Sequence, residues 1–196
     1  MVKIMLATQN KAKLKEFQAL LKPLNYQSFL PSKNLPVLET GQTFSANAIL
    51  KAKAYGRFFG LPVIADDSGL CIDYLNGQPG IHSHRFAVSG FSAARKKILK
   101  LMQHLPRSQR AAKFICCLAY LNPQTKICRV FTGEAKGFIA IKEVGRNGFG
   151  YDPIFFCPDL NKTFGEASFV EKNQFSHRAK ALKKLLTFLK QSAALK

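Results

Sequence analysis

Two adjacent carboxylates, Asp66 and Asp67, form the centre of the most informative stretch of this sequence. They follow a short apolar run, Pro62 to Ala65, and precede Ser68 and Gly69. Neighbouring carboxylates repel each other unless a cation or hydrogen bonds compensate, and Mg²⁺ prefers oxygen ligands that it shares with phosphates. We therefore predict that the pair ends a buried strand and works with a metal ion beside a phosphorylated substrate. An Asx turn is the alternative, although one aspartate would suffice for it.

A polar segment from Thr8 to Lys13, with the sequence TQNKAK, joins an apolar run at 2–7 to a helical pattern at 11–22. The first N–H groups of a helix have no partner within that helix, and together with nearby lysines they make an anion site. The segment therefore predicts a place for phosphate, although it lacks the GxxxxGK[ST] pattern. Capping of the helix by Asn10, with solvated lysines, is the alternative.

Glu39 stands in a turn before a second helix, predicted over Thr43 to Phe59. Asn47 and Lys51 lie one turn apart on that helix and share a face. A glutamate that faces an asparagine and a lysine could meet a metal ion and a phosphate together. A capped amphipathic helix with exposed polar groups explains the same residues without a ligand, so the local sequence leaves both interpretations open.

A glycine-rich segment from Gly145 to Asp152 contains two aromatic residues, Phe149 and Tyr151, on either side of Gly150. Aromatic rings can stack on a nucleobase, and the Asp152 carboxylate can accept hydrogen bonds from it. The segment therefore predicts a base-binding loop. A hydrophobic loop folded into the core is the alternative.

The last helix is predicted to begin at Ser176, which places His177 and Arg178 in its first turn. Cationic side chains are unfavourable there, because the amino end of a helix is the positive end of its dipole. Their presence predicts an anion or a ligand close by that offsets the cost.

Helix and strand patterns alternate early in the chain and strand patterns cluster late, which predicts an α/β fold with a mixed, twisted β-sheet flanked by helices. A third helix is expected to be capped by Ser92. Its inward-facing residues are predicted to be Ile98, Leu101, Met102 and Leu105, and its outward-facing residues Arg95, Lys96, Lys97 and Lys100. The segment 159–175 is predicted to be a loop. The buried face of the last helix is predicted to consist of Leu182, Leu185, Leu186 and Leu189. The sequence shows no repeat and no linker, so we expect one structural unit.

The formal net charge is +19, with 30 Lys and Arg against 11 Asp and Glu. No acidic residue occurs between Tyr74 and Gly133 or after Lys172. Such a field attracts polyanions, which include nucleic acids, acidic membrane surfaces and nucleotide phosphates. A set of solvated faces explains the same charge without a partner.

The five cysteines include no CxxC pair, which favours reduced thiols over a disulfide scaffold or a zinc site. No apolar run approaches the roughly 20 residues that cross a bilayer. The apolar run near the amino terminus is too short for a signal peptide. These features predict a cytoplasmic protein with no membrane partner.

The motifs in this order closely resemble the inosine triphosphate pyrophosphatase family, which hydrolyses non-standard purine nucleoside triphosphates. The resemblance covers nearly the whole chain. The matching segments are TQNKAK at 8–13, ETGQTFSANAILKA at 39–52, ADDSGLCIDYLNGQPGIHSHRFA at 65–87, FGYDPIF at 149–155 and SHRAKAL at 176–182.

The resemblance implies one domain over residues 1–196, with two lobes and a central substrate cleft. It implies Mg²⁺-dependent hydrolysis of ITP, dITP and XTP to the monophosphate and pyrophosphate, in a homodimer with no stable nucleic-acid partner. It implies metal ligation by Glu39 and Asp67, with Asp67 also taking the proton of the attacking water, and supporting catalytic roles for Lys51 and Asp66. Substrate contacts are implied for Thr8, Gln9, Asn10, Lys11, Ala12, Lys13, Ser68, Phe149, Gly150, Tyr151, Asp152, Lys172, His177 and Arg178.

The sequence is compatible with two rival functions. One is a pyrophosphatase of similar fold that acts on modified pyrimidine triphosphates, and a panel of substrates separates it from the purine enzyme. The other is a basic nucleic-acid-binding module in which the acidic cluster is structural. It predicts salt-sensitive binding of DNA or RNA and no Mg²⁺-dependent hydrolysis.

Overall fold

A computed structural model describes residues 2–21 and 26–194 of the protein. The strands are β1 (Val2–Leu6), β2 (Tyr26–Phe29), β3 (Val63–Ile72), β4 (Ala111–Asn122), β5 (Ile127–Ile139), β6 (Phe155–Cys157) and β7 (Lys162–Thr163). The helices are α1 (Lys11–Leu21), α2 (Phe44–Phe59), α3 (Gly90–Leu101), α4 (Phe169–Phe175) and α5 (His177–Ala194). The predicted end of the first helix at Lys22 lies outside the described residues.

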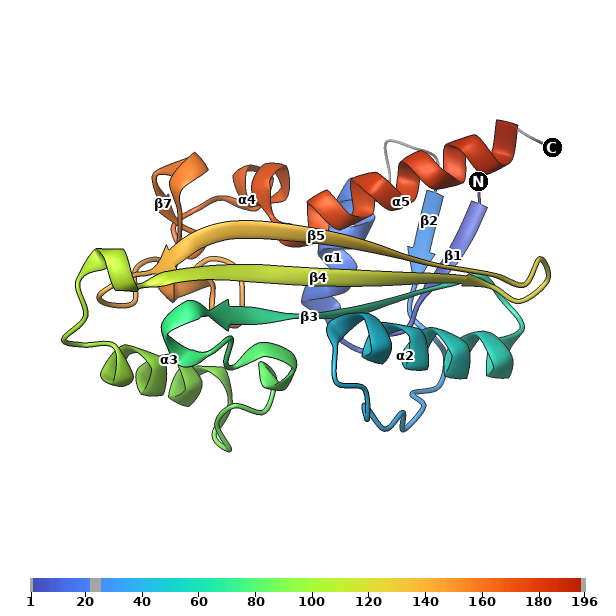
Figure 1. The fold of residues 1–196 in the computed structure, drawn as a ribbon. Helices are drawn as coiled ribbons and strands as arrows, with labels where there is room; N and C mark the ends of the chain where they lie inside the picture. The colour runs from blue at the N-terminus through green and yellow to red at the C-terminus, as the bar shows by residue number, and fades with distance from the viewer. Residues whose placement is uncertain (1, 22–25, 195–196) are drawn as a thin grey trace. The chain divides into compact units, whose positions relative to one another are not determined.

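The described strands form one sheet in the order β2-β1-β3-β4-β5-β6-β7 (Figure 1). β1 pairs in parallel with both β2 and β3, whereas β6 pairs antiparallel with both β5 and β7. The sheet is therefore mixed, and the predicted α/β class is confirmed. Among the described residues, none of the helices is long and apolar enough to cross a membrane.

The chain divides into two compact units. The first unit comprises residues 1–67, 116–133 and 178–196, and the second comprises 68–115 and 134–177. The strands β3, β4 and β5 each contribute residues to both units. A single domain over 1–196 and a central cleft stay predictions.

The core of the first unit lies where α1 and α5 pack on strands of the sheet. Phe17 and Leu21 of α1 are fully buried in it, together with Ile4 of β1 and Ile64 of β3. The predicted stripe of α5 is confirmed, because its four leucines recur with the helical period and all of them are buried. These residues are Leu182, Leu185, Leu186 and Leu189.

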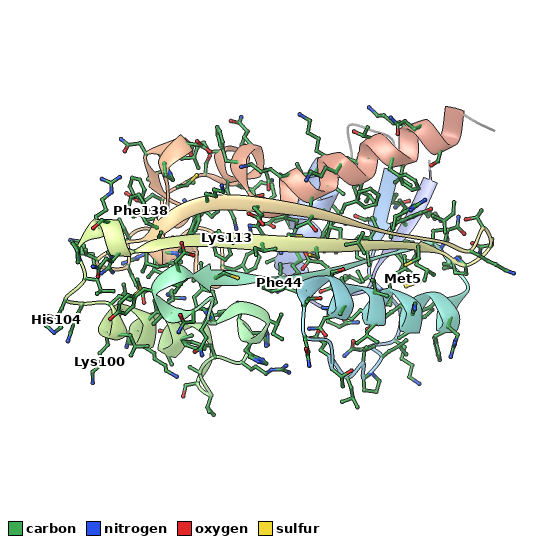
Figure 2. All side chains as sticks on the ribbon, in the orientation of Figure 1. Met5, Phe44, Lys100, His104, Lys113 and Phe138 are labelled. Atoms are coloured by element: carbon green, nitrogen blue, oxygen red, sulfur yellow. The ribbon has the colours of Figure 1, made fainter. Side chains whose placement is uncertain are left out.

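The core of the second unit is built from the far half of β3, the inner face of α3 and a group of aromatic rings. Leu70, Ile98 and Phe155 are fully buried there. Two expectations for α3 were wrong. The helix begins at Gly90, so Ser92 does not cap it, and Leu101 is 51% exposed, because Ile98 and Met102 occupy the buried face. Lys100, next to Leu101, points away from the ribbon, as predicted (Figure 2).

The prediction that a strand ends at Asp66 was wrong, because β3 continues through Ser68 and Gly69 to Ile72. The strand that ends at this point is its neighbour. The last aligned pair of β1 and β3 is Leu6 with Ile64, whereas β4 continues beside β3 on the other side. Asp66 and Asp67 therefore lie just beyond the carboxyl end of β1, where open α/β sheets place their ligands.

The prediction of a loop over 159–175 was also wrong, since it contains β7 and α4. α4 begins with a capping box, in which the Ser168 hydroxyl accepts from the Glu171 N–H and the Glu171 carboxylate accepts from the Ser168 N–H. The Ser-x-x-Glu spacing is visible in the sequence and is a known signal for the start of a helix.

Candidate active site

Lys51 joins the two carboxylates that the sequence assigned to a metal. Its Nζ donates to Glu39 Oε1 at 2.9 Å and to Asp67 Oδ1 at 3.0 Å. Lys51 reaches them from the middle of α2, Glu39 from the loop before that helix, and Asp67 from β3. All three belong to the first unit. The structure thus brings together three residues that lie far apart in the sequence.

Asn47 sets the position of the loop that carries Glu39. It lies one turn before Lys51 on α2, is fully buried, and accepts the Gly41 N–H with its Oδ1 at 2.8 Å. A Cβ atom at position 41 would lie 2.6 Å from that oxygen, so only glycine allows this approach. The shared face of Asn47 and Lys51 therefore holds the backbone and the carboxylate of the same loop.

The electrostatics of Asp67 suit a proton acceptor. Burial raises the pKa of the Asp67 carboxyl, and the opposing attraction of the Lys51 ammonium does not cancel the effect. Burial alone would lower the pKa of Lys51, but Asp67 and Glu39 outweigh it and the Lys51 pKa is raised. Asp67 Oδ2 is buried and has no hydrogen-bond partner among the described residues. A carboxylate with a raised pKa and one oxygen that accepts no hydrogen bond can take a proton.

Asp66 sits in a different environment, although it is the next residue. It accepts from Lys13 Nζ on Oδ1, and on Oδ2 it accepts from Arg178 Nε at 2.7 Å and from Cys116 Sγ at 3.3 Å. Burial would raise the pKa of the Asp66 carboxyl, but Arg178 and Lys13 outweigh burial and hold the pKa well below its usual range. Asp66 therefore stays ionised as an anchor for two cations.

Glu16 and Cys116 complete this cluster, and the sequence prediction missed both. Arg178 Nη1 donates to the Glu16 carboxylate, and both side chains are almost completely buried. The position of Glu16 beside Phe17 gives no signal of burial, because consecutive residues of a helix do not share a face. Cys116 gives no signal in the sequence, because a cysteine in an apolar strand is expected to behave as a small hydrophobic residue.

The anion predicted near the start of α5 is therefore supplied by two carboxylates of the protein itself, Asp66 and Glu16. Asp66 and Glu16 offset the cost of placing Arg178 in the first turn of that helix. His177, one residue earlier, belongs to the second unit, where its ring stacks on Phe114 with the centroids 4.7 Å apart.

The segment from Thr8 to Lys13 follows β1 and begins α1. Asn10 Oδ1 accepts the N–H groups of Ala12 and Lys13, so the predicted capping is present. Of the N–H groups in this segment, those of Gln9 and Lys11 have no acceptor within the part of the chain that the structure describes. Capping therefore leaves donors for an anion in place.

In the second unit, the predicted base-binding loop is organised around Asp152. Its Oδ2 accepts the Phe149 N–H at 2.7 Å and Lys172 Nζ at 2.6 Å. The same ammonium lies 4.6 Å from the centroid of the Phe149 ring, a cation–π contact. Gly148 and Gly150 have positive φ, which lets the chain turn tightly on both sides of Phe149.

Tyr151 supports this loop from the inside. It is buried, its hydroxyl donates to the Ser83 carbonyl at 2.7 Å, and burial raises its pKa to about 12. The alternative of a loop folded into the core therefore fits Tyr151, whereas Phe149 is only partly buried. Ser68, also in the second unit, is partly buried and follows Asp67 directly on β3.

The described residues contain no cluster of three or more Asp, Glu, His or Cys arranged to hold a metal ion. Glu39 and Asp67 form a pair instead, and the open Oδ2 of Asp67 is a carboxylate oxygen that a cation could use. Two carboxylates fit Mg²⁺, which usually keeps several waters and takes its other ligands from substrate phosphates. The pair therefore fits this ion and offers no sulfur or nitrogen ligand for a softer metal.

A mixed α/β sheet with paired carboxylates and lysines beyond its parallel strands defines a class of α/β proteins suited to phosphorylated ligands. The Ham1 family model matches residues 4–188, so the chain belongs to the Ham1 family. It is 43% identical over 197 residues to the dITP/XTP pyrophosphatase of Bacillus licheniformis, covering 98% of this chain and 100% of the relative.

Two further comparisons agree. The chain is 45% identical to the dITP/XTP pyrophosphatase of Geobacillus kaustophilus over 190 residues, which cover 94% of this chain and 93% of the relative. The Staphylococcus aureus Ham1 protein superposes with a TM-score of 0.85 at 37% identity, covering 97% of this chain and 99% of that one. The family suggested by the sequence motifs is thereby confirmed.

Proposed function

We propose that this chain hydrolyses the triphosphates of non-standard purines, ITP, dITP and XTP, to the nucleoside monophosphate and pyrophosphate. Relatives that are 43–45% identical over nearly the whole chain are named dITP/XTP pyrophosphatases, which supports this proposal. The observation that carries it is the Glu39–Lys51–Asp67 cluster, in which Lys51 bonds both carboxylates and the buried Asp67 Oδ2 has no hydrogen-bond partner among the described residues.

In this proposal Asp67 takes the proton from the attacking water, and Glu39 and Asp67 hold Mg²⁺. When bound, the ion would neutralise phosphate charge and lower the pKa of a coordinated water. Lys51 then has a second task. If a cation were held by Glu39 and Asp67, the Lys51 ammonium would be free to stabilise the negative charge that develops on the departing pyrophosphate.

The triphosphate would lie against the segment from Thr8 to Lys13. The open N–H groups of Gln9 and Lys11 at the start of α1 offer donors to phosphate oxygens. Lys13 is held by Asp66 in the same unit, which limits the freedom of its ammonium. Asp66 would thus contribute by placing a phosphate-binding cation, without itself moving a proton.

The nucleobase would be recognised by Phe149 through stacking, by Asp152 and Lys172 through polar contacts, and by Ser68 and His177. A 6-oxopurine accepts hydrogen bonds where adenine donates them. Donors in the site would leave the adenine amino group unpaired, and a buried unpaired polar group is a strong basis for rejection. We propose further that the enzyme acts as a homodimer in the cytoplasm.

A panel of nucleotides tests the proposal. ITP, XTP, dITP, GTP, ATP and a modified pyrimidine triphosphate are each incubated with the chain, with and without Mg²⁺, and pyrophosphate release is measured. Fast release from the first three, dependent on Mg²⁺, is expected. Preference for the pyrimidine, or no release from any of them, contradicts the proposal. Light scattering measures the oligomeric state on the same sample.

A further inference from the structure

Arg95 of α3 reaches the loop that carries Phe149 and Asp152. Its Nη1 donates to the Gly150 carbonyl at 2.8 Å, and its Nη2 lies 3.0 Å from Glu143 Oε2. The side chain is 17% exposed, so the sequence expectation that it faces outward was wrong. All five of these residues lie in the second unit.

Phe91, one helical turn before Arg95, contacts the same loop. Its ring meets the Tyr151 ring edge to face, with the centroids 5.3 Å apart. A Cβ atom at Gly150 would lie 3.5 Å from the Phe91 ring, so that ring covers the glycine directly. Two side chains of one helix therefore contact two consecutive residues of the loop, one through a hydrogen bond and one through apolar packing.

The loop needs such support because its own backbone is permissive. Gly148 and Gly150 both have positive φ, and a glycine at such a position has more conformational freedom than any other residue. The bonds of Asp152 to Phe149 and Lys172 fix the loop internally and to α4. Arg95 holds the Gly150 carbonyl, which lies between the two aromatic residues of the loop.

The guanidinium is held in this orientation at a cost. Arg95 Nε is buried and has no acceptor among the described residues. A buried donor without a partner is unfavourable. The contacts to Gly150 and Glu143 compensate for it, and charge-assisted hydrogen bonds of this kind are stronger than neutral ones.

We propose that Arg95 is a positioning residue that sets the selectivity for the nucleobase by fixing the carbonyl of Gly150, with Phe91 as its apolar counterpart. The inference rests on the proposed function, because it assigns the loop from Phe149 to Asp152 to the base. Arg95 need not touch the substrate. It acts through Phe149 and Asp152, because the placement of these two residues determines the preference of the site for a 6-oxopurine over adenine.

The experiment compares Arg95→Met, which removes the donors, with Arg95→Lys, which keeps a cation and a donor. Lys96→Met is the matched control, since it removes one positive charge from the next, exposed position of α3. Values of kcat and KM are measured for ITP and ATP, and the melting temperature is recorded for each variant. Phe91→Leu tests the apolar contact independently.

Arg95→Met is expected to raise the KM for ITP roughly tenfold, the usual effect of losing one hydrogen bond to a charged group, while kcat changes little. The ratio of kcat/KM for ITP to that for ATP is expected to fall. Arg95→Lys should restore part of both effects, Phe91→Leu should shift them in the same direction, and Lys96→Met should leave them unchanged.

An unchanged KM and ratio in folded Arg95→Met overturns the inference. A merely structural role would lower kcat equally for ITP and ATP, in parallel with the melting temperature, and Arg95→Lys would not restore it. That result also overturns the inference. If Arg95→Met does not fold, the ratio of kcat/KM for ITP to that for ATP is measured in Arg95→Lys and Phe91→Leu, and an unchanged ratio in both overturns the inference. Wild-type chain that releases no pyrophosphate from ITP refutes the proposed function instead, so the two failures are distinguishable.

Discussion

Arg178 Nε donates to Asp66 Oδ2 at 2.7 Å, and the two residues are 112 positions apart in the chain. This bond gives the two neighbouring aspartates different chemistry. Asp66 is saturated by Arg178, Lys13 and Cys116 and has a pKa well below the usual range. Asp67 has a raised pKa and an open oxygen. We infer that Asp67 takes up a proton more readily than Asp66.

Asp67→Asn is expected to abolish the release of pyrophosphate from ITP and to leave the fold intact, because an amide cannot take a proton but has nearly the same shape. Steady-state assays and the circular dichroism spectrum check the two halves of this prediction. Asp73→Asn, at an exposed position just after β3, is the matched control and should retain activity. Near-normal turnover by Asp67→Asn would refute its role as the base.

Glu16→Gln is expected to lower the free energy of unfolding by about 3 kcal/mol, because Arg178 loses one of the two buried carboxylates that compensate its charge. Urea denaturation measures the change. Glu134→Gln is the control. Its ion pair with Lys113 is 3.5 Å long and both side chains are 38% exposed, so its loss should cost less than about 1 kcal/mol. Equal effects in the two variants would contradict the buried role of Glu16.

The raised pKa of Tyr151 predicts that the folded chain loses stability at alkaline pH. Its pKa is about 12 in the folded chain and near 10 when exposed, so the folded state binds more protons in between. The stabilisation is complete below pH of about 10 and is lost as the pH rises towards about 12. Tyr151→Phe keeps the ring and removes the titrating group. The wild-type melting temperature should therefore fall more steeply than that of the variant over this range, and parallel curves would exclude the effect.

The net charge of +19 predicts that capture of nucleotides depends on salt. Lys180, Lys183 and Lys190 of α5 are exposed and make no ion pair among the residues that the structure describes. We expect kcat/KM for ITP to fall between low salt and about 1 M, where the screening length is about 3 Å. Replacing the three lysines by glutamine should reduce that slope. A value of kcat/KM that does not respond to salt would show that the charge has no part in capture.

The sequence alone determined the features that depend on neighbouring residues. The capping of α1 by Asn10 and the apolar stripe of α5 were predictable because each is a local pattern with a local cause. The motifs also identified the family, whereas the metal and proton roles that the resemblance implied for Asp67 stay predictions. Even α4, which the prediction missed, carries a local signal in its capping box.

Only the tertiary structure decided how charged groups distant in sequence are paired. Nothing near Asp66 in the sequence indicates that Arg178, Lys13 and Cys116 surround it, and nothing near Arg95 indicates the Gly150 carbonyl. The continuation of β3 beyond Asp67 likewise depends on which neighbouring strand ends first. The physical reason is that pKa values and loop positions respond to burial and to charges a few ångströms away, and the fold of the chain sets those distances.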